Sequence, residues 1–104
     1  MLFYKSPRGE DLVKDLILNL NGNEKFKVIF ALDMLSTGNT KGLDIKPFRK
    51  SIFELKVGKY RVFYTKTPTD IFIIHFLRKD SKKIRNVDVD IVLKRFKSFR
   101  HLNL

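Results

Sequence analysis

Two basic residues in the middle of the chain, Lys56 and Arg61, stand where a β-hairpin would bring them face to face. They lie in the stretch SIFELKVGKYRVFYTK, in which a Gly-Lys pair supplies a two-residue turn. That turn fixes the register, so Lys56 is expected opposite Arg61, with Glu54 diagonal to Arg61. Like charges opposite each other are destabilising. The pair therefore predicts either a bound phosphate or a solvated sheet face with a Glu54–Arg61 salt bridge.

Six further basic residues are expected near the same cleft, between an open sheet face and a basic loop at residues 39–51. They are Arg49, Lys50, Arg78, Lys79, Lys82 and Lys83. Cationic groups gathered in this way attract phosphate groups. His75 lies in the middle of a strand; a hydrogen-bonded core histidine is the commoner interpretation, and its protonation behaviour would decide whether it is an acid or base.

The spacing of apolar residues predicts the elements that position these groups. Two helices, at residues 6–20 and 23–36, carry apolar stripes, with Ser6 as the cap of the first and Gly22 at a positive φ between them. The segment at residues 2–5 can form a short strand. Three strands and a last helix follow the basic loop: Ile52–Val57, Tyr60–Lys66, Asp70–Arg78 and Asn86–Arg100.

This order predicts an α+β fold and a single domain over residues 1–104: two N-terminal helices packed on an antiparallel meander, plus a C-terminal helix. The two helices are expected to cover the side of the hairpin that carries Leu55 and Val62. The other side, with Lys56, Arg61 and Phe63, is expected to be open.

The charge of +11 is unevenly distributed along the chain, which holds 22 Lys and Arg against 11 Asp and Glu. Residues 1–40 are neutral overall, so residues 41–104 carry the whole excess. Nucleic acid is the first partner this predicts, ahead of an acidic protein and an anionic membrane; a basic surface kept for solubility is the alternative.

The chain contains no cysteine, which excludes disulfides, cysteine metal clusters and cysteine nucleophiles. No apolar run is long enough to cross a bilayer, and the first ten residues lack the apolar stretch of a signal peptide. We therefore expect a cytoplasmic protein with no membrane partner.

Three short motifs, FELK at 53–56, YRVFY at 60–64 and FLRK at 76–79, occur in an order and spacing that resemble a known family. This is the RelE/HigB superfamily of toxins from type II toxin–antitoxin systems, in particular its phage-derived HigB-like branch. The resemblance implies a RelE-like microbial RNase fold and metal-independent, cofactor-free endonucleolytic cleavage of mRNA on the ribosome. It also implies a cognate antitoxin, either HigA-like with a helix-turn-helix or RelB-like.

The resemblance also implies roles for individual residues. Arg61 would clamp the phosphate and Lys56 would add a second cation, with Arg78 and Lys79 at the basic end of the third strand. Glu54 would serve as the base or, alternatively, orient Arg61 through a salt bridge. Further basic residues would hold the RNA backbone: Arg49, Lys50, Lys82 and Lys83.

Two other functions remain open at this stage. A ParE-like member of the same fold would inhibit gyrase by protein contact and cleave nothing, so it would need no phosphate clamp. A non-catalytic RNA-binding module would need aromatic stacking platforms, of which the open face offers only Phe63.

Overall fold

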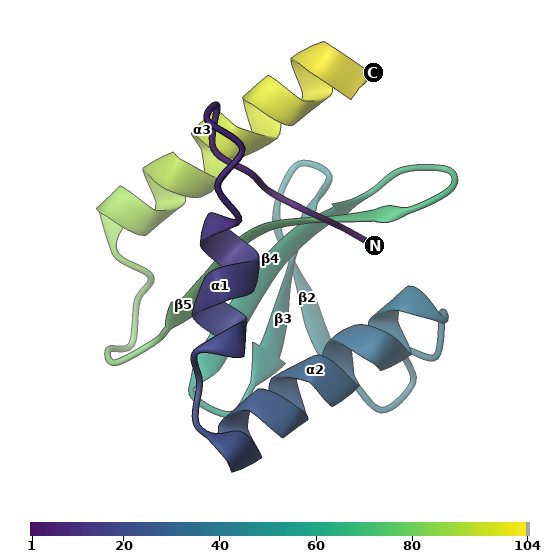
Figure 1. Ribbon diagram of the computed structural model, residues 1–104, viewed down its shortest axis with the longest axis vertical. Helices are drawn as coiled ribbons and strands as arrows, with labels where there is room; N and C mark the ends of the chain where they lie inside the picture. The colour runs from purple at the N-terminus through teal and green to yellow at the C-terminus, as the bar shows by residue number, and fades with distance from the viewer. Residues whose placement is uncertain (104) are drawn as a thin grey trace.

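The computed structural model describes residues 1–103, in which three helices pack on a five-stranded sheet (Figure 1). The strands lie in the order β1-β5-β4-β3-β2. All pairs are antiparallel except β1, which runs parallel to β5. The elements in chain order are β1 Leu2–Phe3, α1 Leu12–Leu18, α2 Gly22–Ser36, β2 Asp44–Arg49, β3 Ile52–Val57, β4 Tyr60–Lys66, β5 Ile71–Arg78 and α3 Asn86–Asn103. The fold is α+β, as predicted, but the sheet is mixed and has two more strands than the expected meander.

The segment expected as a basic loop contains a strand. β2 pairs along β3, with Ile45 opposite Leu55, and the ladder shifts register between Pro47 and Arg49. Ser51 takes a φ of 63° in the tight turn that joins the two strands. A proline is tolerated because β2 is an edge strand, whose outer N–H groups have no ladder partner.

The first helix is shorter than predicted. It begins at Leu12, since Gly9 turns the preceding chain with a φ of 86°. The Ser6 hydroxyl accepts a hydrogen bond from the backbone N–H of Glu10 within that turn, so the predicted cap at Ser6 was wrong. In α2, Asn21 is the N-cap and its side chain accepts from the N–H of Glu24; Gly22 lies within the first turn and has no positive φ.

The β3–β4 hairpin has the predicted register. Lys56 lies opposite Arg61 and Glu54 opposite Phe63. Gly58 adopts a φ of 57° at the first turn position, where a side chain would be strained. The pleat then places alternate residues of the two strands on opposite faces of the sheet.

Two apolar cores lie on the two faces of the sheet. In Figure 1, α2 runs below the strands and α3 above them. One core joins α1 and α2 to Leu55 and Val62; the other joins Val92 and Phe99 of α3 to Phe63. The face expected to be open is therefore covered by α3 over much of its area, and Phe63 is fully buried. The cover ends before Lys56, which is exposed.

Candidate functional site

A row of four residues crosses the uncovered end of the α3 face: Asp44, Lys56, Arg61 and Leu77 are consecutive cross-strand partners on β2 to β5. Lys46 and Glu54 belong to the next row along the same face. We call Lys46, Glu54, Lys56 and Arg61 the hairpin cluster. The facing cations of this cluster each have a carboxylate neighbour, because Asp44 faces Lys56 and Glu54 pairs with Arg61.

Arg61 and Glu54 form a buried ion pair, in which Arg61 Nε lies 3.2 Å from Glu54 Oε2. Only 8% of Arg61 and 3% of Glu54 are exposed. Arg61 Nη1 also donates to the carbonyl oxygens of Gly58 and Tyr60, both at 2.9 Å. Glu54 Oε1 lies 4.0 Å from the exposed Lys46 ammonium. The protein itself thus neutralises the guanidinium, and Glu54 lies between two cations, as expected of a residue that orients Arg61.

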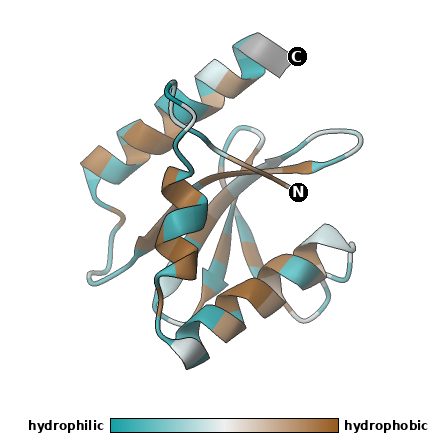
Figure 2. Cartoon of the chain, viewed as in Figure 1, coloured by the Kyte–Doolittle hydropathy of each residue, from teal (hydrophilic) through white to brown (hydrophobic). Residues whose placement is uncertain are grey.

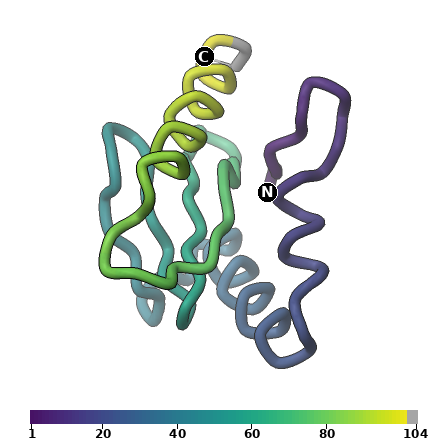
Figure 3. The backbone as a smooth tube through the Cα atoms, turned by 90° about the vertical axis from the view of Figure 1, so that its left-hand side faces the viewer, coloured from purple at the N-terminus to yellow at the C-terminus, as the bar shows by residue number. Residues whose placement is uncertain are grey.

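A polar pocket of about 350 Å³ opens beside this row, between the end of β5, the following loop and the start of α3. Figure 3 shows that loop leaving the end of β5 and returning to α3. We call this pocket the strand-end pocket. One residue that lines the pocket, Leu77, is the cross-strand partner of Arg61, so the pocket adjoins the row of four residues. The lining contains four basic and two acidic side chains: Arg78, Lys79, Lys83, Arg85, Asp80 and Asp88.

The structure brings some of the predicted basic residues together and separates others. Arg78, Lys79 and Lys83 line the strand-end pocket, whereas Lys82 is exposed and is not part of its lining. Arg78 Nε pairs with Asp80 Oδ1 at 3.0 Å, and Lys79 donates its backbone N–H to the carbonyl of Lys59 at 2.7 Å. Of the four basic residues predicted at the end of the third strand, three therefore line the pocket and Lys82 does not.

Arg49 and Lys50 lie at the other end of the sheet, so the expectation that they share the cleft was wrong. Arg49 pairs with Ile52, at the start of β3, while Lys56 is near the end of that strand. The four-residue separation of Ile52 and Lys56 along β3 puts about 13 Å between these positions. Arg49 instead stacks its guanidinium over the Phe48 ring at 4.8 Å.

A polar network behind the pocket joins His75, for which a hydrogen-bonded core position was the preferred prediction, to three residues for which no site role was predicted. His75 Nε2 lies 3.0 Å from Asp88 Oδ1, and Asp88 Oδ2 pairs with Arg85 Nε at 3.0 Å. Arg95 Nη1 approaches His75 Nδ1 at 3.2 Å and donates to the carbonyl of Ile74. His75 is thus a buried, hydrogen-bonded residue. The helical spacing of Asp88 and Arg95 was the available signal that both could face β5.

Burial lowers the pKa of His75, and the nearby Arg95 charge lowers it further, although hydrogen bonding to Asp88 opposes both effects. For Asp88, burial raises the pKa, but the hydrogen bonds from His75 and Arg85 outweigh it and the net shift is downward. At neutral pH the network therefore holds a neutral imidazole against an ionised carboxylate. Burial likewise lowers the pKa of Arg95, whose guanidinium stacks over the Tyr4 ring at 4.1 Å.

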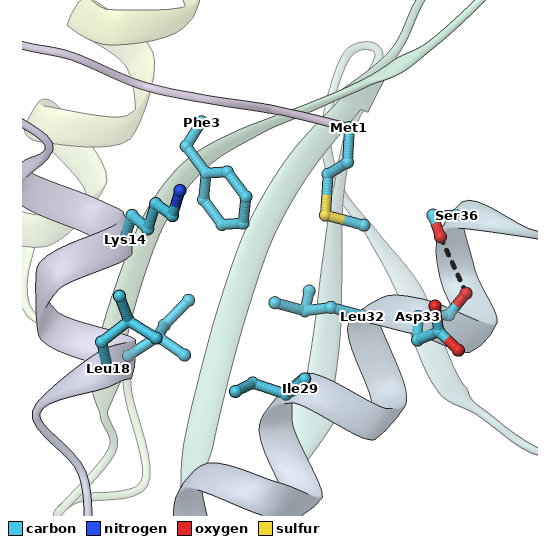
Figure 4. A pocket seen from close by; sticks show the side chains of 9 residues that line it. Met1, Phe3, Lys14, Leu18, Ile29, Leu32, Asp33 and Ser36 are labelled. Carbon is cyan, nitrogen blue, oxygen red and sulfur yellow. Dashed lines mark hydrogen bonds between the residues drawn. The ribbon is translucent and has the colours of Figure 1, made fainter.

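A second hollow, of about 300 Å³, has different chemistry. It lies between α1, α2 and the N-terminal segment, and Figure 4 shows Phe3, Leu18, Ile29 and Leu32 pointing into it. Figure 2 shows apolar residues along both helices. Because its lining is mainly hydrocarbon, this hollow is not suited to a phosphate.

Neither a metal-ligating cluster nor a membrane-spanning helix is found among the described residues. Residues 1–103 contain no group of three or more His, Cys, Asp or Glu side chains that could hold a metal ion. In the same part of the chain, no helix is both long and apolar enough to span a bilayer.

Comparison with known proteins identifies a family and a related fold. The family described as Phage derived protein Gp49-like (DUF891) matches residues 15–97. No curated protein matches the chain. Among solved structures, it is similar to a chain in the crystal structure of the RelB–RelE antitoxin–toxin complex from Methanococcus jannaschii, with a TM-score of 0.59 and 16% identity. The match covers 75% of this chain and 89% of that chain, and at this identity it shows a shared fold.

Proposed function

The chain belongs to the family of phage-derived Gp49-like proteins, and on that basis we propose that it is the toxin of a type II toxin–antitoxin system. In this proposal it lies in the HigB-like branch and cuts mRNA on the ribosome without a metal ion. The fold shared with a chain of an antitoxin–toxin complex supports the toxin assignment. The observation that carries the nuclease assignment is the hairpin cluster adjoining the strand-end pocket, which gathers cations on one end of the sheet.

The proposed reaction suits such a site. The 2′-oxygen of a ribose attacks the adjacent phosphorus, the bond from phosphorus to the 5′-oxygen breaks, and a 2′,3′-cyclic phosphate and a 5′-hydroxyl result. One proton leaves the attacking hydroxyl and one reaches the leaving oxygen. Negative charge builds up on the phosphoryl oxygens in the transition state, where fixed cations stabilise it.

Within this proposal, the exposed Lys56 ammonium and the held Arg61 guanidinium contact the scissile phosphate. Arg61 has Nε beside Glu54 and Nη1 bonded to carbonyls, so it would meet the phosphate through Nη2. Glu54 keeps the guanidinium in place before RNA arrives, which reduces the cost of ordering it during the reaction. Arg78 and Lys79 hold the adjoining RNA from the strand-end pocket.

The proposed partners follow from the same assignment. The ribosome would present the mRNA, and an antitoxin would silence the toxin, as RelB accompanies RelE in the similar complex.

The test is inducible expression of the chain in bacteria, with the 5′ ends of cellular mRNA mapped during growth arrest. Lys56→Gln is the informative variant, because Lys56 is exposed and its replacement leaves the buried Arg61–Glu54 pair intact. Lys5→Gln, at an exposed lysine of the neutral N-terminal part, is the matched control. We expect new ends within codons for the parent and the Lys5 variant, and a loss of at least about tenfold for Lys56→Gln.

Growth arrest with intact messages and DNA damage would contradict the nuclease proposal and favour gyrase inhibition. Binding of RNA without cleavage or arrest would favour a non-catalytic RNA-binding module. Equal cleavage by the Lys56 and Lys5 variants would refute the placement of the site in the hairpin cluster.

A further inference from the structure

We propose that Arg85 binds a backbone phosphate of single-stranded RNA in the strand-end pocket, and that Asp88 is the positioning residue that holds Arg85 ready to bind it. This inference rests on the proposed function, since it takes RNA as the ligand. It adds a second phosphate contact beside the proposed cleavage site, made by a residue of the pocket lining that directly precedes α3.

Arg85 combines exposure with a fixed anchor. Its side chain is 75% exposed at the pocket, yet its Nε pairs with Asp88 Oδ2 at 3.0 Å. Because Nε is engaged, the two Nη groups remain to grip two oxygens of one phosphate, as a guanidinium fork does. An exposed arginine without such an anchor would lose more rotamer freedom on binding.

Asp88 is itself fixed by the sheet. It is 7% exposed, and its Oδ1 lies 3.0 Å from His75 Nε2. Arg95 can only donate to His75 Nδ1, so that nitrogen is the acceptor and Nε2 carries the hydrogen that is donated to Asp88. Arg95 is bonded in turn to the carbonyl of Ile74. An unbroken series of contacts thus runs from β5 to the exposed guanidinium.

The surroundings favour a phosphate over a carboxylate. Four basic side chains line the pocket against two acidic ones, and two of the basic ones, Lys79 and Lys83, form no salt bridge among the described residues. The positive end of the α3 dipole adds to this field, because α3 begins at Asn86, directly after Arg85. The backbone N–H groups of Asp88 and Val89 are bonded to the carbonyl of Arg85. So many donors fit a tetrahedral phosphate with several free oxygens better than a carboxylate with two.

The experiment measures binding of a short 2′-O-methyl RNA oligonucleotide, which cannot be cleaved, to the full chain by fluorescence anisotropy at several salt concentrations. Arg85→Gln is compared with Arg100→Gln, which replaces an exposed arginine of α3 about four helical turns from Arg85. We expect Arg85→Gln to weaken binding about tenfold and to reduce the salt slope by about 0.7, with a much smaller effect of Arg100→Gln.

Asp88→Asn separates positioning from simple charge. Asparagine keeps the shape and an acceptor for His75 but removes one negative charge, so charge alone predicts tighter binding of RNA. If Asp88 positions Arg85, binding weakens severalfold despite the added positive charge. Should Asp88→Asn unfold the protein, Arg85→Lys serves instead: it keeps the charge without the fork and should bind between the parent and Arg85→Gln.

Equal binding by the Arg85 and Arg100 variants, tighter binding by Asp88→Asn, or tighter binding of an acidic peptide than of the RNA would overturn the inference. Its failure can be distinguished from failure of the proposed function, because cleavage is measured separately on cellular mRNA. If Arg85→Gln weakens RNA binding but the parent cleaves no mRNA, the nuclease proposal is refuted and this phosphate contact stands. Cleavage of mRNA by the parent, with RNA binding unchanged in Arg85→Gln, would refute this contact and leave the nuclease proposal standing.

Discussion

Replacing Arg61 with alanine is expected to unfold part of the population, beyond any effect on RNA. The change leaves the Glu54 carboxylate, 3% exposed, without the guanidinium 3.2 Å away. It also removes the donor shared by two backbone carbonyls. Lys46 compensates little, because it is exposed and 4.0 Å distant. Breaking a buried pair in this way costs about 3–5 kcal/mol.

That loss is a large share of the free energy of unfolding, which is about 5–15 kcal/mol for a domain. In a chain of this size it corresponds to a fall in Tm of roughly 15–30 °C. The assay is urea unfolding followed by far-UV circular dichroism, in a double-mutant cycle of Glu54→Leu and Arg61→Met. We expect each single variant to lose several kcal/mol and the double variant to lie within about 2 kcal/mol of the parent, since a buried ion pair can be replaced by apolar groups at little cost.

Additive losses in that cycle, or a cost below about 1 kcal/mol for Arg61→Ala, would refute the reasoning that the pair is buried and coupled. If the pair is coupled as described, loss of growth arrest in Arg61→Ala alone says nothing about phosphate binding. This is why the test of function uses Lys56.

Four further predictions concern stability. Burial lowers the pKa of His75 in the folded protein, so the contribution of this residue to stability is complete above its unfolded pKa near 6.5 and is lost as the pH falls. Unfolding by urea should therefore show the free energy of unfolding falling by up to about 1 kcal/mol between pH 7 and 5.5. This fall should be smaller in His75→Gln. Asn21→Ala removes the cap of α2 and should cost about 1 kcal/mol in the same assay, with Asn23→Ala as the uncapped comparison. Gly58→Ala forces a side chain into a positive φ and should lower stability by about 1 kcal/mol, seen as a lower Tm. Phe63→Ala empties the core beneath α3 and should cost about 3–5 kcal/mol by calorimetry; a cost near zero would mean that α3 does not cover this face.

The sequence was most informative where one local feature determines many positions. The Gly-Lys turn sets the register of the whole hairpin, and a two-residue period then assigns each side chain to a face. Lys56 opposite Arg61 could therefore be predicted from residues 51–66 alone. β2 was missed because its edge position lets Pro47 and three charged residues interrupt the apolar alternation, leaving only Ile45 and Phe48 as markers.

What could not be predicted are contacts between distant segments. The local sequence does not predict that Val92 and Phe99 cover Phe63, because the apolar stripe of a helix does not determine which surface the helix packs on. The same applies to His75 and Asp88, which meet only because the loop after β5 turns α3 back across the sheet. The predicted open face thus proved to be open only at one end.

The outer edge of β2 limits how another protein can attach to this one. Its unpaired backbone is interrupted by Pro47 and flanked by Asp44, Lys46 and Arg49, features that discourage an added strand. This edge therefore disfavours recognition by an added strand and leaves the side chains of the helices and of the cationic end of the sheet as the surfaces for a binding protein. Specific recognition of this chain would then depend on its sequence more than on its shared architecture.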